Sequence, residues 1–252
     1  MISLSERLDR IAGFVRQGDR VADIGTDHGY IPIYLKKKGI SSYLVAGDIN
    51  FGPLEKMEEN LEKHLGADRE GIHMRQGSGL EVIQPWEVDT VVIAGMGGLL
   101  MEEILDADPE KTRSVGRFIL QPRNAQDKLR RWLLEQGFRI VDEALVREGR
   151  FVWEIICAEP NFIGGGEAAG KDYFADRPEQ YEVGQRLIEK KDPLLGDFIR
   201  NKLRLERSIA ENAAKSEQKR AAEQRELSMR KIEMLEGILK DVSTERTTDT
   251  CD

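Results

Sequence analysis

The chain has 252 residues, of which 40% are hydrophobic, 33% are charged and 6% are aromatic. Since domains average about 150 residues, this length suits one domain with an appendage or two small domains. No run reaches the roughly 18 apolar residues of a membrane span, and the opening MISLSERLDR lacks the apolar core of a signal peptide. We therefore expect a cytoplasmic protein with no membrane partner. Only two cysteines, Cys157 and Cys251, and three scattered histidines are present, so we expect neither a disulfide scaffold nor a metal site.

The net charge of −8 argues mildly against a nucleic-acid partner, because phosphate binding favours a positive surface. The distribution of the charges weakens this objection. Residues 1–160 contain 21 basic and 27 acidic side chains, whereas residues 200–231 contain 10 basic and 5 acidic ones. The second segment therefore has a local net charge of +5, and a nucleic-acid partner stays open.

Short apolar runs alternate with amphipathic stretches over residues 1–160, which predicts an α/β domain with a doubly wound, mostly parallel sheet. The expected helices cover residues 4–15, 30–38, 53–65 and 125–136. The expected strands cover residues 20–24, 43–47, 71–75, 88–94, 117–120, 139–147 and 151–158. Only three residues separate the last two strands, so the final strand should be antiparallel.

The glycine-rich stretch 161–176 is expected to be a linker. Beyond it, residues 177–242 show helical patterns and no strand pattern, and the first helix is predicted over 179–190. Residues 243–252 are expected to be a disordered tail.

Residues 194–242 carry their large apolar side chains at both ends, and the two clusters mirror each other about residue 218. One long helix gives no reason for this symmetry. An antiparallel helical hairpin that turns near residues 216–219 explains it. The short, interrupted heptads favour a monomer over a coiled-coil dimer.

The segment VADIGTDHGY, residues 21–30, carries the most information about function. A predicted strand ends in Asp23, and a loop containing Gly25 and Gly29 leads into a helix, so the backbone can approach a nucleotide-like ligand closely. The spacing G-x-x-x-G differs from the dinucleotide fingerprint G-x-G-x-x-G, which disfavours pyrophosphate binding. The acid two residues before the first glycine resembles the first motif of class I S-adenosylmethionine-dependent methyltransferases. The alternative is an ordinary glycine turn in which Asp23 caps a helix.

Three further segments follow in the order expected for that superfamily. Asp48 ends the next strand and can accept hydrogen bonds from both hydroxyls of an adenosine ribose, although NAD enzymes use the same arrangement. The turn QGSG, residues 76–79, follows the third strand, where the superfamily contacts adenine. The segment VVIAGMGG, residues 91–98, runs directly into glycines. It lacks the Asn/Asp-Pro-Pro-aromatic box of enzymes that methylate exocyclic amines, so adenine N6 and cytosine N4 are disfavoured as targets.

The combination of DIGTDHGYIP, AGMGG and LQPRN with a charged helical C-terminal domain resembles the bacterial tRNA (adenine-22)-N1-methyltransferases. The motifs lie between residues 3 and 158, and the remainder resembles the family only in its helical character. The resemblance implies a Rossmann-like, seven-stranded methyltransferase fold with a C-terminal coiled-coil hairpin. It also implies S-adenosyl-L-methionine as cofactor and tRNA as partner. The cofactor-binding residues expected on this basis are Asp23, Gly25, Thr26, His28, Gly29, Asp48, Ile49, Gly77, Ser78, Gly79, Ala94, Gly95 and Met96.

Ring nitrogen N1 of adenine is a neutral nucleophile at neutral pH, so methyl transfer to it requires alignment rather than a general base. The product ring is cationic, and a nearby carboxylate would stabilise the transition state more than the neutral substrate. Asp27 is the candidate for this catalytic role, and the alternative is a turn residue that caps the following helix. Tyr30 is the second catalytic candidate, through stacking on or hydrogen bonding to the base, although packing explains it equally well. His28 suits a loop hydrogen bond better than catalysis.

N1 lies on the Watson–Crick edge, so the target must be unpaired or flipped out, which favours a folded RNA. Arg123 and Asn124 are expected to hold the phosphate or the base, and the alternative is a helix start capped by Asn124. At the predicted hairpin tip, the expected RNA contacts are Lys215, Lys219, Arg220 and Arg225, here called the tip cations. The alternative is a solvated coiled coil that only stabilises the protein. Other basic residues, including Arg7, Lys128, Arg130 and Arg131, are expected on solvated helix faces.

Three other functions remain open. A nicotinamide-dependent oxidoreductase would explain Asp48 but conflicts with the broken dinucleotide fingerprint. A non-catalytic RNA-binding or scaffold protein on a methyltransferase fold would have no need of Asp23 and Asp48. A third alternative keeps the cofactor and changes the acceptor to another RNA, a small molecule or a protein.

Overall fold

The structure is a computed structural model that describes residues 2–161, 178–215 and 218–248. The chain divides into two compact units, Met1–Lys171 and Asp172–Asp252, and each is considered by itself. The linker expected at 161–176 lies outside the described residues except for Asn161. No helix in the described ranges is long and apolar enough to cross a membrane.

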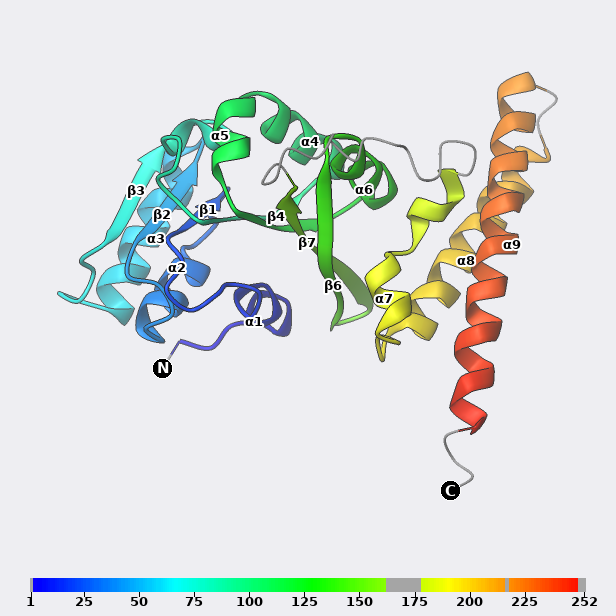
Figure 1. Cartoon of the computed structure of the whole chain (residues 1–252), viewed down its shortest axis with the longest axis horizontal. Coiled ribbons are helices and arrows are strands. Elements are labelled where there is room, and N and C mark those ends of the chain that lie inside the picture. The colour runs from blue at the N-terminus through cyan, green and yellow to red at the C-terminus, as the bar shows by residue number, and fades with distance from the viewer. Residues whose placement is uncertain (1, 162–177, 216–217, 249–252) are drawn as a thin grey trace. The chain divides into compact units, whose positions relative to one another are not determined.

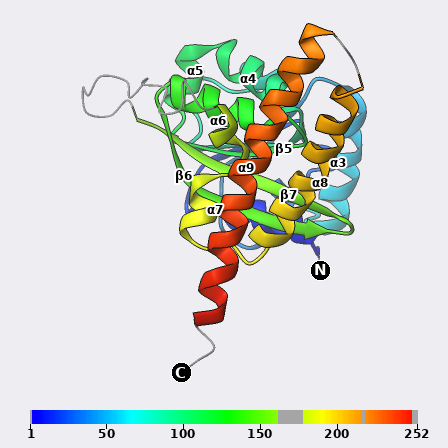
Figure 2. The ribbon, with the colours of Figure 1, turned by 90° about the vertical axis from the view of Figure 1, so that its right-hand side faces the viewer.

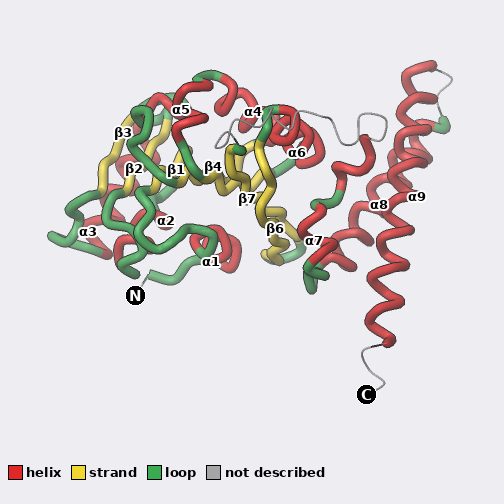
Figure 3. Tube along the Cα trace, viewed as in Figure 1, coloured by secondary structure: helices red, strands yellow, loops and turns green. Residues whose placement is uncertain are grey.

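The described part of the N-terminal unit contains seven strands, which Figures 1 and 3 show between helices. The strands are β1 (Val21–Ile24), β2 (Leu44–Asp48), β3 (Ile72–Gln76), β4 (Thr90–Met96), β5 (Arg117–Pro122), β6 (Phe138–Glu148) and β7 (Phe151–Pro160). The helices are α1 (Glu6–Ala12), α2 (Tyr30–Lys37), α3 (Phe51–His64), α4 (Gly98–Asp106), α5 (Pro109–Ser114) and α6 (Gln126–Glu135), with a 3₁₀ turn η1 (Gly79–Val82).

The seven strands form one sheet in the order β3–β2–β1–β4–β5–β7–β6. Strands β1 to β5 pair in parallel, whereas β7 is antiparallel to both β5 and β6. The predicted doubly wound sheet and its antiparallel final strand are therefore confirmed. The strand order changes direction at β1, which pairs with both β2 and β4, and open α/β sheets bind their ligands beside the carboxyl ends of the strands at such a point.

Helices cover both faces of this sheet. In β4, Val91 and Ile93 pack with residues of α4 and α6, whereas Val92 packs with residues of α1 and α2. All three valine and isoleucine side chains are fully buried. Because both faces are covered, the central strands are continuous apolar runs, which is why the sequence pattern located them well.

Two of the helices on these faces, α4 and α5, were not predicted, and α1 is shorter than the expected helix over 4–15. Helix α1 begins after Ser5, whose hydroxyl accepts a hydrogen bond from the Leu8 amide, and ends at Ala12 before Gly13. Strands β4 and β5 extend two residues beyond their expected ends, to Met96 and Pro122. These extensions carry the AGM and QP segments to the edge of the sheet where the candidate site lies.

Arg130 of α6 was expected on a solvated face and is instead buried, with only 3% of the side chain exposed. Its guanidinium pairs with Glu143 of β6 at 2.7 Å and also with Glu154 of β7. The prediction was wrong because both carboxylates come from strands that follow in the sequence, and a basic residue between Leu129 and Arg131 carries no sign of them. A buried guanidinium requires such partners, since an unpaired charge in the core is costly.

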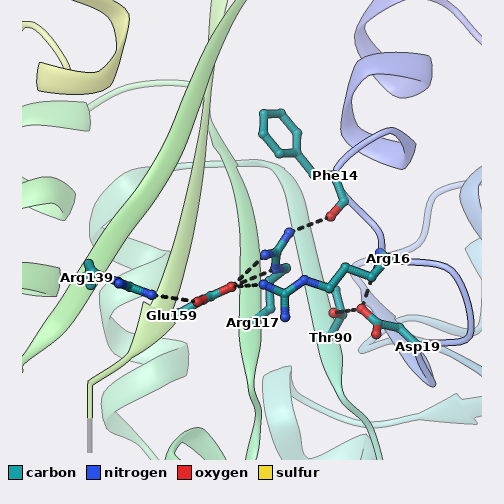
Figure 4. Close-up of polar contacts among 7 residues, drawn as sticks. All are labelled: Phe14, Arg16, Asp19, Thr90, Arg117, Arg139 and Glu159. Carbon is teal, nitrogen blue, oxygen red and sulfur yellow. Dashed lines mark hydrogen bonds and ion pairs between the residues drawn. The ribbon is translucent and has the colours of Figure 1, made fainter. Parts of the chain in front are cut away.

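A cluster of arginines around Glu159 links residues 14–16, which follow α1, to the sheet (Figure 4). Glu159, near the end of β7, lies 2.6 Å from Arg16, 2.6 Å from Arg117 and 3.2 Å from Arg139. Arg117 also donates a hydrogen bond to the carbonyl oxygen of Phe14 at 3.0 Å. Burial opposes ionisation of Glu159, but the arginines dominate and lower its pKa. This cluster fixes the position of the chain that leads out of α1.

The described part of the C-terminal unit is helical. It contains the 3₁₀ turn η2 (Pro178–Glu182), α7 (Gln185–Glu189), α8 (Leu195–Ala213) and α9 (Lys219–Thr248). Figures 1 and 2 show α8 and α9 running side by side in opposite directions, which confirms the predicted hairpin. Its seam contains buried apolar residues such as Leu203 and Leu235, and Arg207 of α8 pairs with Glu236 of α9 at 2.6 Å.

Two predictions about this unit were wrong. The helix expected over 179–190 is interrupted at Gly184, whose backbone is extended with φ −62° and ψ 130°, so a 3₁₀ turn and a short helix replace it. Helix α9 continues to Thr248, whereas the domain was expected to end at 242 and residues 243–252 to be disordered. No glycine or proline occurs between residues 238 and 248 to end the helix earlier. Residues 249–252 lie outside the described ranges.

Candidate active site

A cleft of about 590 Å³ opens at the carboxyl ends of β1, β2, β4 and β5. Twelve of the residues predicted for the site lie together on its wall, although the strands that position them are far apart in the sequence. These residues are Asp23, Gly25, Thr26, Asp27, His28, Gly29, Tyr30, Asp48, Ala94, Gly95, Met96 and Arg123.

The loop between β1 and α2 passes close to its neighbours and requires its two glycines. Gly25 and Gly29 have φ angles of 73° and 69°, in the left-handed region that favours glycine. A Cβ atom on Gly25 would lie 2.1 Å from Cε of Met96, and one on Gly29 would lie 2.4 Å from Cγ of Met57. Neither position therefore admits a side chain without strain, and both glycines line the cleft.

Asp23 is a buried carboxylate at the base of this loop, with 6% of the residue exposed. No cationic side chain pairs with it among the described residues. Burial raises the pKa of Asp23 to about 6, and the negative charge of Asp48 adds to the rise, while the Thr26 hydroxyl partly opposes it. A ligand with an ammonium group would supply the missing cation, so this position fits the amino-acid end of S-adenosylmethionine.

Asp48 lies on the same wall at the end of β2. One of its carboxylate oxygens accepts a hydrogen bond from the Asn50 amide at 2.7 Å, which leaves the other oxygen available for a ribose hydroxyl. The Gly77 amide donates to the Asp48 carbonyl oxygen at 3.0 Å and brings the turn after β3 beside β2. Ile49 is 62% exposed next to this turn. Ile49, Gly77, Ser78 and Gly79, which were also expected to bind the cofactor, are not among the residues that line the cleft.

The last residues of β4, Ala94, Gly95 and Met96, line the cleft. Gly95 has a φ of 78° and lies at an irregularity in the β4–β5 pairing, between Ala94 and Met96. Such a bulge re-aims the chain at the edge of a sheet. Ala94 remains paired with Gln121 of β5, so these two strands place their last residues side by side.

Asp27, His28 and Tyr30 lie at the mouth of the cleft. The Asp27 side chain is 78% exposed, and its carboxylate lies 3.3 Å from Nε2 of His28. The rings of His28 and Tyr30 are 5.3 Å apart. Helix α2 is capped by Gly29 without any side-chain hydrogen bond, so the alternative that Asp27 caps this helix is wrong. An exposed carboxylate with no capping role is free to face an incoming base.

The LQPRN segment contributes Arg123 and Asn124, which the structure separates. Arg123 lines the cleft, and its amide donates to the Met96 carbonyl oxygen at 2.7 Å. Asn124 lies outside the cleft, where its carbonyl oxygen accepts from the Gly98 amide. Helix α6 is capped by Ala125 without a side-chain hydrogen bond, so the alternative of an Asn124 cap is also wrong.

Five residues of the cleft were missed by sequence reasoning: Arg7, Leu8, Ile31, Gln121 and Trp153. Arg7 was expected on a solvated face, but its side chain is only 24% exposed and pairs with Glu148 at 3.0 Å. Its partners Gln121 and Glu148 lie more than one hundred residues away in the chain, and the sequence around Arg7 does not indicate them. Gln121 and Ile31 were the two with a signal, because they belong to the quoted LQPRN and DIGTDHGYIP motifs.

The tip cations belong to the C-terminal unit and are considered within it. All four are exposed, on α9 or beside the turn that joins α8 to α9. Lys215 donates to the Asn212 side chain at 3.1 Å, and Lys219 lies 3.8 Å from Glu223. Across both units, the described residues contain no group of three or more histidine, cysteine, aspartate or glutamate side chains that could hold a metal ion.

Comparison with known proteins agrees with this geometry. Residues 4–156 match a family model described as a methyltransferase domain. The tRNA (adenine(22)-N(1))-methyltransferase of Bacillus subtilis strain 168 is 37% identical over 158 residues, which are 63% of this chain and 66% of that protein's length. Neither of these two matches supports the alternative function of a nicotinamide-dependent oxidoreductase.

Solved structures extend the similarity to nearly the whole chain. The crystal structure of the B. subtilis m1A22 tRNA methyltransferase TrmK superimposes with a TM-score of 0.80 at 30% identity and covers 95% of this chain and 100% of that one. Streptococcus pneumoniae Sp1610 in complex with S-adenosyl-L-methionine gives a TM-score of 0.75 at 30% identity, with coverages of 94% and 100%. The predicted fold class, a Rossmann-like methyltransferase sheet with C-terminal helices, is confirmed. The chain belongs to the methyltransferase-domain family.

Proposed function

We propose that this protein transfers a methyl group from S-adenosyl-L-methionine to N1 of the adenosine at position 22 of tRNA. The observation that carries the proposal is the buried carboxylate of Asp23, which has no cationic partner in the described structure and lies on one cleft wall with Asp48. The same cleft belongs to a chain 37% identical to a tRNA (adenine(22)-N(1))-methyltransferase.

The cofactor supplies an electrophilic methyl group on a sulfonium sulfur. In our proposal, Asp23 accepts hydrogen bonds from the ammonium group and the backbone of residues 25–29 surrounds the amino-acid end. Asp48 accepts hydrogen bonds from the ribose hydroxyls. Ile49 follows Asp48 in the chain and the Gly77 amide donates to the Asp48 carbonyl oxygen, and we assign Ile49, Gly77, Ser78 and Gly79 to the adenine ring of the cofactor.

The target base must present N1 to the methyl group from the open side of the cleft. The N1 lone pair forms the new bond while the carbon–sulfur bond breaks and its electron pair stays on sulfur, so no proton moves at N1. The positive charge of the sulfonium passes to the adenine ring. Asp27 stabilises this charge, and Tyr30 supports the base beside it. Arg123 holds a phosphate or the base at the same mouth.

The two units divide the work in this proposal. Residues 1–160 form the catalytic domain, and the helical domain that begins at 177 positions the RNA through the tip cations. Exposed lysines and arginines neutralise phosphates without recognising sequence, so their contribution is to affinity and orientation. We further propose that the protein acts in the cytoplasm and as a monomer. The monomer is proposed because the short apolar seam of the hairpin is buried between α8 and α9 and is therefore not available to a second chain.

The test is incubation of the purified protein with an unmodified tRNA transcript and labelled S-adenosylmethionine, followed by nucleoside analysis. The expected product is N1-methyladenosine, at one residue per tRNA. A transcript with guanosine in place of adenosine 22 is the matched control and should stay unlabelled. A different methylated nucleoside, or equal labelling of the control transcript, would contradict the acceptor.

A further inference from the structure

An enzyme that methylates N1 must recognise adenine without covering N1. The edge that remains carries the N6 amino group, a hydrogen-bond donor, and N7, an acceptor. A glutamine or asparagine amide matches this edge with two hydrogen bonds, its oxygen accepting from N6 and its nitrogen donating to N7. The cleft should therefore contain such an amide on its acceptor side.

Gln121 is the only amide side chain among the described residues that line the cleft. It lies near the end of β5, only 1% exposed, and is paired in the sheet with Ala94 of β4. The cofactor contacts expected above come from the ends of β1, β2, β3 and β4, whereas Gln121 lies on β5, the next strand beyond β4 in the sheet, close in the chain to Arg123, which is assigned to the acceptor. Gln121 thus lies on the side of the cleft that the cofactor leaves to the acceptor.

The orientation of the Gln121 amide follows from its two neighbours. Arg7 Nη1 donates to Oε1 at 2.9 Å, and a guanidinium has no acceptor, so the oxygen must face Arg7. Nε2 donates to the Pro122 carbonyl oxygen at 3.1 Å, and a carbonyl can only accept. The amide keeps one N–H and one oxygen lone pair without a partner in the described structure, which is the set that adenine N7 and N6 require.

Arg7 is in turn held in place from two strands. Its Nε donates to Glu148 of β6 at 3.0 Å, and its guanidinium carbon lies 6.0 Å from the ring centre of Trp153 in β7. Its charge is therefore neutralised by Glu148, and two of its five N–H donors are used by Glu148 and Gln121. Arg7 thus acts on the Gln121 amide as a positioning residue.

We propose that Gln121 recognises the target base through N6 and N7 and that Arg7 fixes the amide in the orientation this requires. The inference rests on the proposed N1-adenine methylation and adds the determinant of base specificity. Guanine presents the acceptors O6 and N7 on the same edge, so the fixed oxygen of Gln121 would face O6 without a hydrogen. Adenine is accepted and guanine is rejected by the same amide.

The test combines a protein change with an atomic change in the RNA. Wild type and Gln121→Met are each assayed on tRNA with adenosine or 7-deazaadenosine at position 22; 7-deazaadenosine keeps N1 and N6 and lacks the N7 acceptor. We expect kcat/KM of the wild type to fall about tenfold on the deaza substrate, the effect of one lost base contact. Gln121→Met should lose at least as much on natural tRNA and nothing further on the deaza substrate.

Arg7 supplies a second measurement. Arg7→Met should also lose the sensitivity to 7-deazaadenosine, whereas Arg7→Lys, which keeps a donor toward Oε1, should recover part of it. Gln136→Met, at the exposed end of α6, is the matched control and should behave as wild type. Calorimetric affinity for S-adenosylmethionine should be unchanged in all variants, which shows that the fold is intact.

Full wild-type activity on 7-deaza tRNA would overturn the inference even if every variant failed to fold. The inference would also be overturned if Gln121→Met lost as much kcat/KM on going to the 7-deaza substrate as the wild type does. The amide and N7 would then act independently. If the wild type forms no N1-methyladenosine on natural tRNA, the proposed function fails and this inference fails with it. If the wild type methylates N1 of natural tRNA but either of the first two results above is found, the proposed function stands and only the role of Gln121 is refuted.

Discussion

Replacement of Asp23 by asparagine should stabilise the ligand-free protein while it weakens cofactor binding. The pKa of this buried carboxyl is raised from 3.8 to about 6, so the folded state binds the proton more tightly than the unfolded state. A rise of about two units corresponds to about 3 kcal/mol. The contribution of Asp23 to the free energy of unfolding should therefore fall by up to this amount as the pH rises from about 4 to about 6, and then stay level.

Asparagine has nearly the same shape and no charge to bury. Asp23→Asn should thus be more stable than wild type by up to about 3 kcal/mol at pH values well above 6, and the two proteins should converge near pH 4. The assay is urea unfolding followed by tryptophan fluorescence, since all three tryptophans, Trp86, Trp132 and Trp153, lie in the N-terminal unit. Calorimetry on the same variant should show weaker binding of S-adenosylmethionine by about 1.5–3 kcal/mol, the worth of hydrogen bonds to a charged group.

Asp27→Asn is the matched control for stability, because the Asp27 side chain is 78% exposed and carries no comparable burial cost. Its unfolding free energy should follow that of the wild type at every pH. An Asp23→Asn variant that is not stabilised at neutral pH would show that the buried charge of Asp23 does not destabilise the protein. Stabilisation that persists unchanged near pH 4 would rule out the charge as its cause, since a charge effect must vanish once the wild-type carboxyl is protonated.

Three further predictions concern binding and turnover. Asp48→Ala should weaken S-adenosylmethionine binding by about 1.5–3 kcal/mol without unfolding the protein, and an unchanged calorimetric affinity would remove Asp48 from the site. Asp27→Asn should lower the single-turnover rate at saturating cofactor more than it lowers cofactor affinity; the reverse pattern would make Asp27 a binding residue. Replacement of the four tip cations by glutamine should weaken tRNA binding and flatten its dependence on salt, and a salt dependence equal to that of wild type would place the RNA elsewhere.

The cofactor half of the cleft was predictable because its information is local. Asp23 is the last residue but one of β1 and Asp48 is the last residue of β2, and Gly25 and Gly29 lie two and six residues after Asp23. Parallel strands of one sheet bring their carboxyl ends together, so the residues that follow them meet without any further signal. The helical hairpin was predictable for the same reason, since the apolar clusters of α8 and α9 mirror each other along the sequence.

The features that sequence reasoning missed depend on pairs distant in the chain. Arg130 is a basic residue on an amphipathic helix, and only the folded sheet supplies Glu143 and Glu154 to bury it. The end of α9 was misplaced for a different reason. Polar residues at 243–248 fit an exposed helix as well as a disordered tail, and composition alone does not distinguish them.

The acceptor half of the cleft is built by the same kind of distant pairing. Arg7 comes from α1, Gln121 from β5 and Trp153 from the antiparallel β7, so they meet only through the packing of elements that are distant in the chain. Their positions depend on α1 staying against the sheet, and the arginines around Glu159 hold the chain just after that helix (Figure 4). A change at Glu159 should therefore act at a distance on base recognition while it leaves the Asp23 and Asp48 contacts intact. The two halves of the cleft can vary separately, so a common cofactor site is compatible with different acceptors in other methyltransferases built on this sheet.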